Sequence, residues 1–183
     1  MLFESADSQF SQFSQFQSLT FSPDDPSRGF GLDGSNSLQL LDIDQTGIST
    51  GTQIRDLLEG RDAVFSNGFF YTTGLQKFDP NTLAVVQNYE VPELGRNDQA
   101  EAVFRLGDRL LALFNLFDRG VFVATFDEET GEYIGQRIPP QFGDFFDRGF
   151  GSSPQVTVGG EQWVALANDN GIIIIPQEEL IAE

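Results

Sequence analysis

The stretch VFVATFDEETGEYI, residues 121–134, contains the pattern that decides the fold. Apolar residues lead into Asp127, a short acidic turn follows, and Gly131, which tolerates positive φ, precedes a second apolar pair. An Asp side chain accepts hydrogen bonds from the backbone of its own turn, so Asp is favoured where a strand ends and the chain reverses. The stretch therefore predicts two strands joined by a tight turn.

Two other segments follow the same plan, LQKFDPNTLAVV at residues 75–86 and LQLLDIDQTG at residues 38–47. In each segment one Asp is predicted to end the first of the two strands, which is the third strand of its unit. These residues are Asp42, Asp79 and Asp127, and they lie 37 and 48 residues apart. A unit of four short strands that recurs every ~40–50 residues is typical of a β-propeller blade. The sequence thus predicts an internal repeat of blade-like units.

Additional hairpins complete the units. Asn67-Gly68 suits a type I′ turn between strands at 63–66 and 69–72. Similar hairpins are predicted at 102–114 and 155–167, followed by a strand at 172–175. The four resulting units are Ser18–Gly60, Arg61–Asn97, Asp98–Gly151 and Ser152–Glu183, and the last of them lacks a fourth strand.

We therefore predict an all-β fold of about four propeller-like, four-stranded blade units at residues 18–183, preceded by a Phe-, Gln- and Ser-rich arm at residues 1–17. The units form either a closed small propeller, with the N-terminal segment supplying the missing strand, or half of a larger ring completed by a second chain. Two short helices are also predicted, at 52–60 and at 176–181.

The turns at 127–131 (DEETG) and 78–82 (FDPNT) resemble those between the third and fourth strands of quinoprotein-like and YVTN-type β-propeller repeats. This resemblance implies a propeller fold and little about function, because such folds serve as enzymes, scaffolds and binding modules. The Trp that ends many quinoprotein repeats is missing from these turns, so binding of pyrroloquinoline quinone is not implied.

The composition excludes several functions. The chain has 28 acidic and 10 basic residues, a formal net charge of −18, and neither His nor Cys. A Ser-His-Asp triad, a thiol nucleophile and a zinc site of the usual kind are therefore excluded, and we expect no nucleic-acid partner. Apolar runs such as 172–175 are far too short to span a bilayer, so we expect no membrane insertion. The scarcity of lysine among many acids is compatible with an extracellular or high-salt setting, and residues 1–7 do not have the pattern of a signal peptide.

The Ser-Gln-Phe repeat of the arm places Phe10, Phe13 and Phe16 three residues apart, a period that fits neither a helix nor a strand. One interpretation is a loosely ordered terminus. The other is that the three rings anchor the arm, either on a protein partner or on another copy in a homodimer.

Asp42, Asp44 and Thr46 match the first half of a calcium-binding loop, although the twelfth position is Gln53 where the pattern has Glu. Calcium is thus the one cofactor considered, and an ordinary acidic turn is the alternative. Paired carboxylates at 24–25, 127–129 and 144–147 could serve a hydrolase, but so many acids make accidental pairs inevitable.

Arg-Gly pairs recur at Arg28, Arg119 and Arg148. These arginines are predicted to form ion pairs between blades, and an anion site at the mouth of a channel is the alternative. Taken together, the sequence favours a non-catalytic binding or assembly scaffold. The alternative from another class is a calcium- or carboxylate-dependent hydrolase with its site at the channel mouth.

Overall fold

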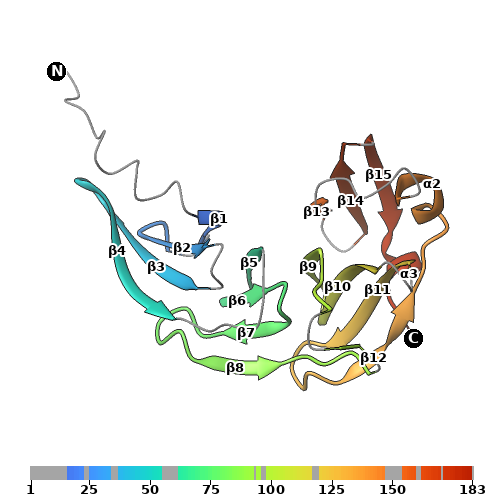
Figure 1. The fold of residues 1–183 in the computed structure, drawn as a ribbon, viewed down its shortest axis with the longest axis horizontal. Coiled ribbons are helices and arrows are strands. Elements are labelled where there is room, and N and C mark those ends of the chain that lie inside the picture. Colours follow the sequence, from blue (N-terminus) through green and yellow to red (C-terminus); the bar gives the residue numbers. More distant parts are fainter. Residues whose placement is uncertain are drawn as a thin grey trace.

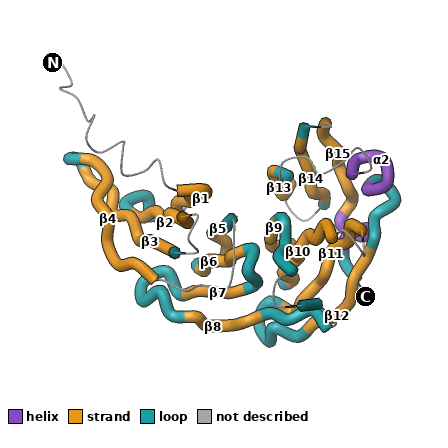
Figure 2. The backbone as a smooth tube through the Cα atoms, in the orientation of Figure 1, coloured by secondary structure: helices purple, strands orange, loops and turns teal. Residues whose placement is uncertain are grey.

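The computed structural model describes residues 16–22, 25–33, 37–54, 62–92, 94–95, 98–116, 120–146, 154–159, 162–169 and 171–182, and every structural statement below concerns these residues. Their fold is all-β, with four antiparallel sheets that follow one another along the chain and form an open arc, as Figure 1 and Figure 2 show. Each sheet consists of strands that are consecutive in the sequence, as a propeller blade requires.

The strands of the four sheets are as follows. The first sheet contains β1 (Phe16–Phe21), β2 (Arg28–Asp33), β3 (Leu38–Asp44) and β4 (Gly47–Ile54). The second contains β5 (Ala63–Ser66), β6 (Phe69–Thr72), β7 (Gln76–Phe78) and β8 (Val85–Asn88). The third contains β9 (Ala102–Leu106), β10 (Arg109–Leu116), β11 (Gly120–Asp127) and β12 (Tyr133–Arg137). The fourth contains β13 (Gln155–Gly159), β14 (Trp163–Asn168) and β15 (Gly171–Pro176).

The first strands of neighbouring sheets lie side by side: β1 contacts β5, β5 contacts β9, and β9 contacts β13. The sheets are therefore arranged like consecutive blades. Figure 1 places the first and fourth sheets at opposite ends of the arc. The described strands thus form four blade-like units but no closed ring.

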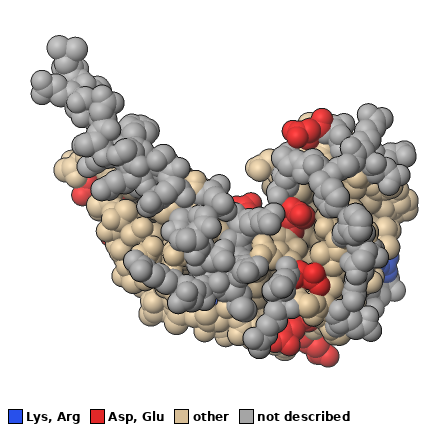
Figure 3. Space-filling model, in the orientation of Figure 1, with Lys and Arg blue, Asp and Glu red and all other residues tan. Residues whose placement is uncertain are grey.

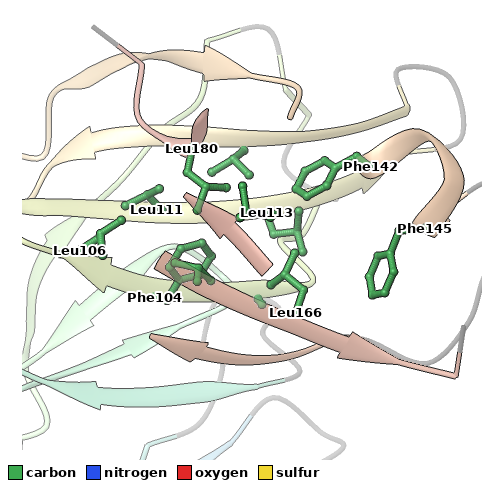
Figure 4. Packing of buried hydrophobic residues seen from close by; sticks show 12 residues of the cluster. Phe104, Leu106, Leu111, Leu113, Phe142, Phe145, Leu166 and Leu180 are labelled. Carbon is green, nitrogen blue, oxygen red and sulfur yellow. The ribbon is translucent and has the colours of Figure 1, made fainter. Parts of the chain in front are cut away.

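Hydrophobic cores lie between neighbouring sheets, because alternate residues of each inner strand face opposite neighbours. Leu110, Ala112 and Phe114 of β10 pack toward the second sheet, whereas Leu111 and Leu113 pack toward the fourth. Figure 4 shows the latter cluster, in which Leu166, Phe142 and Phe145 join the side chains of the third sheet. Burial on both faces requires strands that are apolar almost throughout.

Several sequence predictions are confirmed. Asn67 and Gly68 both have positive φ, 50° and 74°, as a type I′ turn requires. The Oδ1 atom of Asp79 accepts hydrogen bonds from the backbone N–H groups of Asn81 and Thr82, both at 2.8 Å. The equivalent oxygen of Asp127 accepts them from residues 129 and 130 at 3.2 and 2.8 Å. The local turn chemistry is therefore as the sequence predicts.

The predicted turn position in the first unit is wrong by two residues. Strand β3 continues through Asp42, which pairs with Arg28 and Ser49, and ends at Asp44. Asp44 Oδ1 then accepts hydrogen bonds from the N–H and Oγ1 of Thr46, at 2.7 and 2.6 Å. Asp42 and Asp44 both have the side chain that such a turn needs, and cross-strand pairing decides that Asp44 opens it. The equivalent residues are therefore Asp44, Asp79 and Asp127.

The helix predicted at 52–60 is wrong over residues 52–54, which belong to β4, and residues 55–61 lie outside the described part. Ile48, Thr50 and Thr52 are β-branched, and pairing with β3 outweighs the weak helical pattern. The terminal helix is confirmed as α3 (Gln177–Leu180), whereas α2 (Phe142–Phe146) is not predicted by the sequence. No described helix is long and apolar enough to cross a membrane.

Candidate functional site

A buried polar network joins the second and third sheets around the carboxylate of Glu128. The ammonium group of Lys77 and the hydroxyl of Tyr71 both donate to Glu128 Oε1, the latter at 2.6 Å. Arg105 Nε lies 3.7 Å from Oε2, and the hydroxyl of Tyr89 donates to the backbone oxygen of Glu128 at 3.1 Å. Lys77 and Glu128 are only 8% and 7% exposed. The carboxylate of Glu128 thus pairs with two cationic side chains and accepts hydrogen bonds from the second sheet, so this network is a structural connection between the two sheets.

The ionisation of the network follows from its contacts. Burial by itself raises the pKa of Glu128, but hydrogen bonds from Lys77 and Tyr71, with the charges of Lys77 and Arg105, outweigh it and lower that pKa. Burial and the adjacent carboxylate raise the pKa of Tyr71 far above its ordinary value. Glu128 therefore stays ionised and Tyr71 stays a hydrogen-bond donor.

Each of the three junctions between neighbouring sheets contains a polar contact at the same level of the earlier sheet. This level is marked by the third-strand residue that lies two positions before the Asp of the turn. In the first sheet this level pairs Asp42 with Arg28, and Arg28 donates to Asn81 Oδ1 in the turn of the second sheet at 2.7 Å. In the second sheet it pairs Lys77 with Tyr71, the two donors to Glu128.

In the third sheet the same level contains Thr125, whose Oγ1 accepts a hydrogen bond from the backbone N–H of Ala182 at 3.2 Å. Ala182 follows the last strand of the fourth sheet, just as Asn81 and Glu128 follow the third strands of theirs. The second, third and fourth sheets therefore each use the segment after their third strand to contact the preceding sheet. The junctions therefore have the same direction along the chain: the later sheet always contributes the segment after its third strand, and the earlier sheet contributes residues at the level described above.

Of the arginines singled out in the sequence, only Arg28 is described, and Arg119 and Arg148 lie outside the described residues. Arg28 contacts Asn81 of the next sheet, and its Nε lies 3.5 Å from Asp25 Oδ2. This contact crosses between sheets as predicted, but its partner is the side-chain amide of Asn81, so it is a hydrogen bond and not an ion pair. The anion site stays a prediction.

The residues of the predicted calcium loop lie in a tight hairpin. Asp42, Asp44 and Thr46 are all exposed, and Asp44 Oδ1 is occupied by hydrogen bonds within its own turn. Gln53, at the twelfth position, lies along β4 and pairs with Gln39. No group of three or more potential acidic metal ligands occurs among the residues that the structure describes. Calcium binding stays a prediction, which a melting-temperature titration with calcium can test.

The carboxylate pairs considered for a hydrolase are only partly described. Asp127 accepts a hydrogen bond from Arg109 at 2.9 Å, and its neighbour Glu128 belongs to the buried network. Asp25 Oδ1 accepts hydrogen bonds from the N–H and hydroxyl of Ser27. Glu129 is exposed, and the side chains at 24, 144 and 147 are not described. The hydrolase stays an alternative prediction.

Phe10 and Phe13 of the arm lie outside the described residues, whereas Phe16 is the first residue of β1. An added Cβ on Gly31 would lie 2.6 Å from the ring of Phe16, and one on Gly29 would lie 2.9 Å from the ring of Phe21. The glycines of β2 therefore provide room for two aromatic rings on the outer face of the first sheet. Strand β1 pairs with β2, so this segment belongs to the first sheet.

The outer face of the fourth sheet exposes large apolar side chains. Residues paired across antiparallel strands point to the same side, so Trp163, Ala165 and Ala167 of β14 share a face with Ile174 and Ile172 of β15. Ile172 and Ile174 are 73% and 63% exposed, and Trp163 is 38% exposed. The opposite face, with Val164, Leu166 and Ile175, is buried against the third sheet.

The outer face of the first sheet has a similar character. Leu19 and Phe21 of β1 are 46% and 50% exposed and pair with Gly31 and Gly29. On both outer faces the strand residues whose side chains are described are apolar or uncharged. Acidic side chains emerge instead at several separate places on the face of the molecule in Figure 3. The two outer faces thus expose large apolar side chains among described residues that carry no charge, on a chain with a net charge of −18.

Sequence reasoning did not identify these two exposed outer faces. The alternation of Ile172 and Ile174 with Ile173 and Ile175 is visible in the sequence, but a buried strand has the same apolar run. Which side of β15 has a neighbour is decided by the position of the third sheet.

The fold defines a class: an arc of propeller-like blades with two terminal faces that no described sheet covers. No protein-family model matches the chain, and no curated protein sequence matches it. Among solved structures, the chain is similar to that of U3-55K, a WD40 β-propeller protein, with a TM-score of 0.54 and 13% identity. The match covers 88% of this chain and 52% of that one, so this chain spans about half the length of U3-55K. The likeness concerns the fold, and the quinoprotein-like or YVTN-type resemblance stays a prediction.

Proposed function

We propose that this protein is a non-catalytic binding or assembly module, an incomplete ring of blades that a second chain completes. The terminal faces are its contact surfaces. The observation that carries this proposal is the exposure of Ile172, Ile174, Leu19 and Phe21 on uncharged faces of a very acidic chain. Exposed apolar patches of this kind are typical of surfaces that bind another protein.

The inner junctions support the same conclusion. At each one, an apolar sheet face is covered by the face of the next sheet. The two terminal faces also carry large apolar side chains, as the covered faces do, but no described sheet lies against them. An open arc favours completion by a second chain over closure by this chain alone.

The proposal can be tested with a photo-crosslinking amino acid placed at Ile174, in cells that naturally contain the protein. The matched control is Ile138, which is 65% exposed, nearly the same as Ile174, but follows β12 away from the terminal faces. We expect one defined polypeptide to be crosslinked at position 174 and none at position 138. Absence of an adduct at 174, or the same adducts at both positions, would contradict the proposal.

A further inference from the structure

Given the proposed function, on which this inference rests, we infer that the second chain is another copy of this protein. The fourth sheet of each copy packs against the first sheet of the other, so that two arcs close one ring through two identical junctions. Four observations carry this inference: the composition of the faces, their charge, the direction of the inner junctions and the span of the arc.

The two terminal faces are suited to each other. Ile172, Ile174 and Trp163 project from the fourth sheet, while Leu19 and Phe21 project from the first. The junction between the third and fourth sheets is built in the same way, with aliphatic side chains from both sides. Packing one terminal face on the other would remove both from water at once, which is the main driving force for association.

Charge selects a second copy over a basic partner. Two chains of net charge −18 repel each other, and a contact surface without carboxylates adds no local repulsion to that of the net charges. The described strand side chains on the two terminal faces are uncharged, so this contact buries no carboxylate among them. A basic partner would find no complementary charge at these side chains. At physiological salt the remaining repulsion is screened beyond about 8 Å.

The direction of the inner junctions along the chain favours a contact between a fourth and a first sheet over a contact between two fourth sheets. At each inner junction, the segment after the third strand of one sheet contacts the preceding sheet, as Asn81, Glu128 and Ala182 do. In the first sheet this segment is the turn opened by Asp44, whose Gln45 and Thr46 are exposed. A further junction of the same direction would place this turn beside a fourth sheet, which in the proposed dimer belongs to the second copy.

The span of the arc sets the number of copies. The four sheets of this chain match 52% of the length of the chain of U3-55K, a WD40 β-propeller protein. We therefore infer that two arcs of this length make up one ring. Contacts between unlike surfaces form a closed ring when the rotation returns to its start, and here that occurs after two copies.

The test uses the purified chain, whose mass is 20.3 kDa, in light scattering coupled to size exclusion. We expect the wild type to have twice this mass. Ile174→Asp alters only the face of the fourth sheet and Leu19→Asp only that of the first. Each should weaken association about tenfold or more, because a buried unpaired carboxylate is unfavourable. Ile138→Asp is the matched control and should leave the mass unchanged, and circular dichroism shows whether each variant is folded.

Mixing the two variants provides the decisive measurement. The Leu19→Asp chain retains an intact fourth sheet and the Ile174→Asp chain an intact first sheet, so a mixed dimer has one wild-type junction. We expect the mixture to form dimers that neither variant forms alone. Dimers lost in Ile174→Asp but kept in Leu19→Asp would overturn the inference in favour of like faces in contact, and species larger than a dimer would overturn it in favour of an open polymer.

A monomeric wild type would also overturn the inference, and the crosslinking experiment then separates the two proposals. If position 174 still captures one defined polypeptide that is not this chain, the binding function stands and the second copy is wrong. If it captures nothing, both proposals fail.

Discussion

The carboxylate of Glu128 is the group whose removal should destabilise the protein most clearly. Glu128→Gln keeps the shape of the side chain but leaves the ammonium group of Lys77 buried without its counter-charge. Lys77 is 8% exposed, and its Nζ then faces mainly the ring of Phe69, whose centroid is 4.1 Å away. That cation–π contact is already present in the wild type, so it does not compensate for the loss.

The magnitude follows from these contacts. Removing one partner of a buried ion pair typically costs about 3–5 kcal/mol. The Gln oxygen still accepts the hydrogen bond from Tyr71, a contact worth roughly 1 kcal/mol, so we expect a loss near the lower value, about 3 kcal/mol. For a domain of this size that corresponds to a melting temperature lower by roughly 6–12 °C.

The dependence on pH has a definite sign. The folded-state pKa of Glu128 lies below its ordinary value of 4.5, so the stability it contributes is complete above pH 4.5 and is lost as the pH falls through the folded-state pKa. The difference in free energy of unfolding between the wild type and Glu128→Gln should therefore shrink on acidification. Other carboxylates titrate equally in both proteins and cancel in this difference.

Urea unfolding followed by circular dichroism measures both quantities. The double variant Lys77→Met/Glu128→Gln is the control, and it should be more stable than Glu128→Gln because no ammonium group is left unpaired. A loss below about 1 kcal/mol for Glu128→Gln, or a difference that does not change between pH 6 and pH 3, would refute the assignment of the network as a structural ion pair.

Three further predictions concern single positions. In Gly159→Ala the added Cβ would lie 2.0 Å from the indole of Trp163, so the ring must move; we expect a loss of about 1–3 kcal/mol and a red-shifted emission of this sole tryptophan, and unchanged emission would contradict it. Lys77 is the only lysine, so an amine-reactive label should modify the folded chain at its amino terminus and reach Lys77 only in urea; equal labelling rates in mass spectrometry would show that Lys77 is accessible. Arg28→Ala removes an exposed contact with Asn81 and should cost about 1 kcal/mol or less in thermal unfolding, so a loss above ~2 kcal/mol would mean that this junction depends on Arg28.

The turns of the fold were predictable because their chemistry is local. Asp79 and Asp127 bind backbone groups two and three residues ahead, and Asn67-Gly68 needs only its own backbone preference. The prediction was wrong where two local solutions compete, as for Asp42 and Asp44, and for the helix at 52–60, part of which pairs as a strand with β3.

The candidate site was much less predictable. Lys77 and Glu128 are 51 residues apart, and an acidic chain offers Lys77 many other partners of the same chemistry. The exposure of Ile174 was also hidden, because an isoleucine of a buried strand looks the same in the sequence. Several phenylalanines outside the arm, such as Phe30, Phe70 and Phe126, lie between sheets, where the sequence alone did not place them.

Residues within a few positions of one another decided most of the turns and strands and the division into four units, since hydrogen bonds of Asp, Asn and Gly in a turn depend on neighbours only. The tertiary structure decided which face of each sheet is covered, which charges are paired inside, and that the first and fourth sheets end the arc with apolar faces exposed. Burial depends on which surfaces the whole chain brings together, and identical apolar strands acquire opposite roles according to whether another sheet lies beside them.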